Sequence, residues 1–141
     1  MSKTKTMLAT LALGATIAFA GPAFAAKMKA TLDGKSETPP NASTGTGTAD
    51  IDYDAASKKL SWKLTYSGLS GPATAAHFHG PAEAGKNAGV AVAIPNAGTS
   101  PVEGSATLTD AQAADLEAGK YYVNVHTAAK PGDEIRGQVS K

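Results

Sequence analysis

The chain of 141 residues contains no cysteine. It therefore has no disulfide framework and no thiol chemistry, and its core alone must hold the fold together. An excess of charge of one sign is also missing, because 13 basic residues stand against 12 acidic ones. A balanced charge gives no reason to expect nucleic acid or an anionic membrane as a partner.

Long apolar runs are absent as well. The longest, residues 7–20, has 14 residues and ends at a Gly-Pro step, whereas a membrane-spanning helix needs about 20. Lys3 and Lys5 precede this run, and small residues follow it up to Ala25. This order is typical of a secretory signal peptide. We expect residues 1–25 to be a signal peptide and the protein to be exported, periplasmic or secreted, with no membrane insertion after cleavage.

The remaining residues, 26–141, suffice for one domain and not for two. Apolar and polar side chains alternate along them in short segments, as Leu60, Trp62 and Leu64 do with their neighbours. Such alternation is typical of strands with one buried and one solvated face. The predicted strands lie within residues 28–34, 48–54, 59–69, 73–80, 89–95, 102–109, 120–127 and 134–140. Eight short strands separated by turn residues predict an all-β fold, an antiparallel Greek-key β-sandwich or a small barrel.

One segment departs from the alternation. Thr109 and Gln112 have the spacing of a capping box, alanine-rich residues follow, and Gly119 stands where a helix would end. We expect one short helix at residues 110–118, joining two strands.

Two loops contain candidate motifs. Gly45 and Gly47 precede a strand, so they lack the strand–loop–helix context of a phosphate- or dinucleotide-binding loop. Residues 81–89 form a longer connection. A loop in that position either shapes a site or is a plain surface turn.

The histidines are the strongest functional signal. The chain has three, and His77 and His79 flank Phe78. Residues two apart in a strand share a face, so both imidazoles leave the core if Phe78 enters it. This loop-adjacent pair therefore offers two ring nitrogens on one side of a sheet.

The same alternation extends this face to two other strands. It places Tyr122, Asn124 and His126 opposite the apolar residues of their strand, and Glu134 and Arg136 on the polar side of the last one. If these strands are neighbours, the outer face of one sheet carries three imidazoles, a carboxylate and a guanidinium.

The segments AHFHGPAEAGKNAGVAV and GKYYVNVHTAAKPGDEIRGQV resemble the CHRD domain, first described in chordin and common in exported bacterial proteins. The resemblance covers essentially all of residues 26–141 and implies an immunoglobulin-like or superoxide-dismutase-like β-sandwich. It implies no general activity, although chordin itself is a growth-factor-binding protein. The family often has a glycine where this chain has Asp133, so we expect a slightly different turn there.

Imidazole is the usual ligand of zinc and copper, and His126 would complete a set of three with an open fourth position. Glu134 would be a fourth ligand or would accept a proton from an imidazole. Arg136, the only arginine of the chain, suits a forked pairing with a carboxylate or a bound anion. Asn124 and Tyr122 would support the site from the same face.

Three functional hypotheses follow. In the first, an exported binding protein coordinates copper or zinc through His77, His79 and His126. In the second, these histidines form a hydrogen-bond network in a structural or interaction module, whose envelope or extracellular protein partner meets sheet edges or loops. The third is a mononuclear copper redox enzyme. Three histidines are too few for a binuclear copper–zinc site, and no nucleophile elbow indicates a hydrolase triad.

Overall fold

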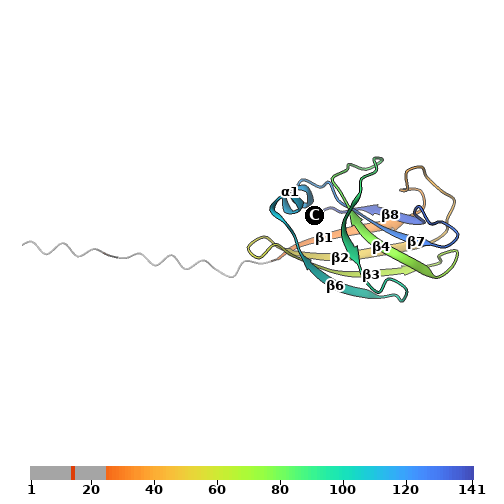
Figure 1. Ribbon diagram of the computed structural model, residues 1–141, viewed down its shortest axis with the longest axis horizontal. Coiled ribbons are helices and arrows are strands. Elements are labelled where there is room, and N and C mark those ends of the chain that lie inside the picture. The colour runs from red at the N-terminus through yellow and green to blue at the C-terminus, as the bar shows by residue number, and fades with distance from the viewer. Residues whose placement is uncertain (1–13, 15–24) are drawn as a thin grey trace, which may run out of the picture.

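A computed structural model describes Gly14 and residues 25–141 of the chain (Figure 1). The signal peptide expected at residues 1–25 falls, but for Gly14 and Ala25, outside the described residues. Within the part of the chain that the structure describes, no helix has the length and apolar character needed to cross a bilayer.

The described residues form antiparallel strands and one short helix, which confirms the all-β prediction. The elements are β1 (Ala26–Asp33), β2 (Thr46–Asp54), β3 (Lys59–Ser67), β4 (Ala73–His79), β5 (Val90–Ile94), β6 (Val102–Thr107), α1 (Asp110–Glu117), β7 (Tyr122–Thr127) and β8 (Ile135–Gln138). The predicted capping box is present, since Thr109 and Gln112 bond reciprocally at the start of α1. Gly119, with a φ of +76°, follows the end of α1.

All eight strands belong to one hydrogen-bonded sheet in the order β5-β4-β7-β8-β1-β2-β3-β6. The sheet folds over so that β4 faces β3 across the core, where the rings of Phe78 and Trp62 lie 5.3 Å apart. The chain crosses between the two halves after β3, after β5 and through α1, which makes non-consecutive strands neighbours. The fold is thus a sandwich whose layers are joined along one edge, a nearly closed arrangement close to a barrel.

The joined edge lies where β8 meets β1. The ladder there consists of the pair Asp33 and Arg136, extended by the bridge between Lys29 and Ser140. Gly137 permits this close approach, because a Cβ at that position would lie 2.2 Å from the carbonyl oxygen of Thr31. On its other side β8 pairs with β7, which places the candidate residue Arg136 opposite Asn124.

The core lies between the two halves and is filled as the alternation predicts. The inward side chains of β4, β7 and β8 are fully buried: Phe78, Val123, Val125 and Ile135 are each 0% exposed. The alternate residues of the same strands therefore face outward, so β4, β7 and β8 present the predicted polar residues on one common face.

Candidate metal centre

The pairing of β4 with β7 brings the three histidines together. In this antiparallel pair, His77 lies opposite Asn124, and His126 lies opposite Ala75, one diagonal step away from His77. The small side chain of Ala75 leaves room for the His126 ring to lean toward β4. One ring nitrogen of each histidine lies within 4.8 Å of the others.

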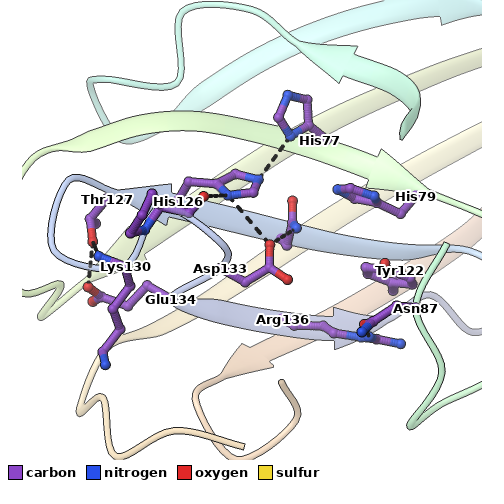
Figure 2. A network of polar contacts seen from close by, with 12 residues as sticks. His77, His79, Asn87, Tyr122, His126, Thr127, Lys130, Asp133, Glu134 and Arg136 are labelled. Carbon is purple, nitrogen blue, oxygen red and sulfur yellow. Dashed lines mark hydrogen bonds and ion pairs between the residues drawn. The ribbon is translucent and has the colours of Figure 1, made fainter. Parts of the chain in front are cut away.

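The closest pair already has the spacing of two ligands. His77 Nδ1 and His126 Nε2 are 3.0 Å apart, as Figure 2 shows with a dashed line. Imidazole nitrogens bind zinc at about 2.0 to 2.1 Å, so two of them on one ion stand about 3 to 3.5 Å apart. The widest pair in the cluster would have to close by about 1 Å to bind the same ion.

Backbone carbonyls set the tautomers of two of the three rings. His79 Nδ1 lies 2.9 Å from the carbonyl oxygen of Ala88, and His126 Nδ1 lies 2.9 Å from that of Pro131. A carbonyl oxygen only accepts, so Nδ1 must carry the proton in both rings. The Nε2 atoms of His79 and His126 then carry lone pairs, and a proton on the opposite nitrogen is the usual support of a metal-bound imidazole.

Neither of these lone pairs has a hydrogen-bond partner other than a histidine. His79 Nε2 is buried and has no partner among the described residues. His126 Nε2 faces only His77, which donates its Nδ1 proton in the absence of an ion. Burial first, and then the imidazoles of His126 and His79, lowers the pKa of His77. The lowered pKa favours the neutral form of His77, which is the form that binds metals.

Asp133 lies near the Nδ1 atom of His126, and Asn124 holds Asp133 in place. The Asp133 Oδ1 atom lies 3.5 Å from His126 Nδ1 and also accepts a hydrogen bond from Asn124 Nδ2. Asn124 is completely buried. The carboxylate thus lies on the Nδ1 side of the ring, where metal-bound imidazoles commonly have a carboxylate or carbonyl partner.

Tyr122 and Arg136 support His79 by stacking. The Tyr122 ring is parallel to the His79 ring, with centroids 4.9 Å apart, and the Arg136 guanidinium lies 3.5 Å from the centroid of Tyr122 on β7. The Tyr122 hydroxyl also donates to the carbonyl oxygen of Ala88, at 3.1 Å. His79 is thus fixed by a cation–π stack and by the same carbonyl that sets its tautomer.

The sequence predicts a forked pairing of Arg136 with a carboxylate or a bound anion, and among the described residues Arg136 pairs with no carboxylate. Its Nη1 donates to Asn87 Oδ1 at 3.0 Å and its Nη2 donates to the carbonyl oxygen of Lys86 at 2.5 Å. Both acceptors belong to the loop of residues 81–89. A loop that folds over a sheet has carbonyl groups that are not hydrogen-bonded within a strand pair, and these need other donors. The guanidinium group of Arg136 supplies them. This loop therefore shapes the site and is not a plain surface turn.

Glu134 also differs from its predicted role. Its carboxylate accepts hydrogen bonds from the hydroxyl groups of Ser43, Ser70 and Thr127 and from the backbone N–H of Ser70. Figure 2 shows it beside Thr127, away from His79. Glu134 precedes the first residue of β8, so its side chain turns to the end of the sheet. It ties two loops together, and Asp133 takes the position beside the imidazole.

The face that carries the site is largely covered, although the alternation predicts a solvated one. Arg136 and Asn124 are at most 1% exposed, and His79 is 9% exposed. Two loops, residues 34–45 and 81–89, lie over the face and bond to each other through Asn87 Nδ2 and the carbonyl oxygen of Thr38. The three imidazoles thus lie at the border of a buried polar layer.

Sequence reasoning missed the supporting groups from loops. Asp133 follows a Pro-Gly step. Aspartate is common in turns of this kind, so the sequence does not indicate a role at the site. The carbonyl groups of Ala88 and Pro131 have no sequence signal at all. The only available hint was the position of both loops, one directly after His79 and the other directly after His126.

A comparison with known protein families identifies the domain. A CHRD domain family model matches residues 28–139, which include every strand except the first two residues of β1. No curated protein and no solved structure matches the chain. The matched segment covers nearly the whole described domain, together with all three histidines. The chain therefore belongs to the CHRD domain family.

Proposed function

We propose that this protein is an exported metal-binding module in which His77, His79 and His126 coordinate one copper or zinc ion. The observation that carries the proposal is the convergence of three imidazoles, two of which have Nδ1 protons fixed by backbone carbonyls. One ring nitrogen of each imidazole lies within 4.8 Å of the others. That is the arrangement a metal centre needs before the ion arrives.

The ligand set favours copper or zinc over harder ions. Three neutral nitrogens suit these two metals, whereas calcium and magnesium require oxygen ligands. Ligand binding also needs little rearrangement at His77. Its Nδ1 proton now lies toward His126, and a shift of that proton to Nε2 would turn Nδ1 into the third ligand without changing the charge of the ring.

The alternative is a structural or interaction module of the cell envelope or the extracellular space. It is favoured by the direct contact between His77 Nδ1 and His126 Nε2, because 3.0 Å is an ordinary hydrogen-bond length. In that case the histidines would only hold β4 against β7. The two functions differ in what an added metal does: the first requires tight, saturable binding and the second requires none.

Calorimetric titration of the metal-free protein with zinc and with copper separates them. The proposal predicts about one ion per chain, and His77→Ala should weaken binding at least about 100-fold. His77 is the suitable position because its ring bonds to another histidine of the cluster and to no backbone carbonyl, so the fold loses little. Asp50→Ala, on the outer face of β2, is the control and should bind as the wild type does. Equal affinity in wild type and His77→Ala would refute the proposal.

A further inference from the structure

Two acidic side chains meet at the edge of the loop of residues 34–45. Glu37 is 4% exposed, and its Oε1 atom has no hydrogen-bond partner among the described residues. Burial first, and then the charge of Asp133 and a hydrogen bond with it, raises the pKa of Glu37 to about 8. A buried carboxylate beside another one is unfavourable unless a positive charge or a proton joins them.

Lys35 and Lys130 lie near the acidic pair, but neither forms an ion pair with it within 4.0 Å among the described residues. Arg136 donates to Asn87 Oδ1 and to the carbonyl oxygens of Lys86 and Glu83, and it attracts Glu37 only from a distance. Among residues 25–141, the only ion pair of Asp133 within 4.0 Å is with His126, and Glu37 has none. The His126 proton is already given to the carbonyl oxygen of Pro131. No lysine or arginine of the described residues therefore forms an ion pair with the acidic pair.

The pair also borders a space large enough for one. A cavity of about 430 Å³ is lined by Glu37 and Asp133, by the polar residues Thr38, Asn41 and Asn87, and by Lys130. Asn41 and Asn87 use their amide oxygens within the fold, one for Ser43 N–H and the other for Arg136. Protein oxygen ligands would thus come mainly from the two carboxylates, and the volume leaves room for the water molecules of a hydrated ion.

We propose that Glu37 and Asp133 form a second cation site, which takes a hard, oxygen-ligated divalent ion of the calcium type. This inference goes beyond the proposed function, because its ligands are oxygen atoms and the three-histidine cluster supplies nitrogen atoms. The two sites should therefore select different ions. Two carboxylates with the remaining positions filled by water give weak binding, with a Kd of about 10⁻⁴ to 10⁻³ M.

Calcium chloride titrated into the full chain at about pH 8.5 tests the site, since Glu37 must be ionised to bind. Calorimetry should give about one calcium ion per chain. Glu37→Gln, which keeps the size of the side chain, should weaken binding at least about tenfold. Glu83→Gln is the matched control: its side chain is exposed on the neighbouring loop, and its calcium affinity should stay unchanged. His77→Ala should also bind calcium as the wild type does, which separates this site from the three-histidine one.

A second readout needs no variant. Calcium that binds only the folded state must raise the thermal unfolding midpoint of the wild type as its concentration passes the Kd. Absence of both the calorimetric signal and the shift in the midpoint at up to about 10 mM calcium, ten times the expected Kd, would overturn the proposal. Calcium binding of the same strength in folded Glu37→Gln would overturn it too.

Discussion

Each half of the sheet carries a row of polar residues, and the two rows differ in their exposure to solvent. On β1, β2 and β3, Lys29, Asp50 and Lys63 lie side by side across three strands and are exposed. On β4, β7 and β8, the equivalent row is His77, Asn124 and Arg136, and the last two are buried. The first row is a solvated surface, whereas loops cover most of the second.

The difference shows what a covered sheet face requires. Exposed lysines and aspartates need no specific partner, because water satisfies them. Under a loop, each polar atom must find a protein partner, and each loop carbonyl must find a donor. Tyr122 and Arg136 provide those donors for residues 81–89. The same requirement fixes the tautomers of His79 and His126. Their Nδ1 protons are donated to the loop carbonyls of Ala88 and Pro131, so their Nε2 atoms carry no proton.

The largest loss of stability is expected for a substitution in the buried row, at Arg136. Arg136→Ala removes the donors for Asn87 Oδ1 and two loop carbonyls and the packing on Tyr122, so the free energy of unfolding should fall by about 3 kcal/mol. Lys63→Ala, in the exposed row, should change it by less than about 0.5 kcal/mol. Urea unfolding of both variants measures the difference. Equal losses would show that the covered face contributes no more than the exposed one.

A smaller, pH-dependent effect is expected at Glu134. Burial alone would raise the pKa of this carboxyl, but hydrogen bonds from Ser70, Thr127 and Ser43 outweigh it and lower the pKa below the ordinary 4.5. A lowered pKa stabilises the fold fully above pH 4.5, and this stabilisation is lost as the pH falls through the folded value. Glu134→Gln should cost about 1 to 3 kcal/mol at pH 7.

The Glu134→Gln variant should also lose part of the acid sensitivity of the wild type. Unfolding curves at pH 7 and below pH 4 measure this, because the difference between wild type and variant must shrink toward low pH. A difference that stays constant with pH would mean that the carboxylate charge plays no part in tying the loops.

The smallest change in stability is expected at the exposed ion pair between Lys27 and Asp52, on two strands of the exposed half. Lys27 Nζ lies 2.5 Å from Asp52 Oδ1 across β1 and β2, with most of the lysine side chain in water. Asp52→Asn should change the free energy of unfolding by about 0 to 0.5 kcal/mol, less still at high salt. Denaturation at low and high salt tests it. A loss as large as that of Arg136→Ala would remove the contrast between the faces.

Much of the fold follows from the sequence because its determinants are local. The alternation in each strand, the capping box at Thr109 and the turn residues between strands are all visible along the chain. Parity alone places His77, His79 and His126 on one face, and the strand pairing then brings them together. These predictions depend on residue spacing, which the folded chain preserves.

The rest depends on contacts between distant loops, which spacing does not encode. Glu134 was expected beside the histidines and instead binds Ser43 and Ser70, 91 and 64 positions away in the sequence. The buried Glu37 meets Asp133 only because two loops fold over the same face. A sequence shows which face a strand residue occupies, but it does not show what covers that face.

The central claim is that the fold presets three imidazoles for a metal ion, and nitrogen-15 NMR of the histidine rings tests it most directly. Without metal, His79 and His126 should carry their proton on Nδ1, and so should His77. One equivalent of zinc should then shift the Nε2 signals of His79 and His126 and move the His77 proton from Nδ1 to Nε2. Rings that keep their metal-free signals in the presence of zinc, or Nε2 protons on His79 and His126 in its absence, would contradict the claim.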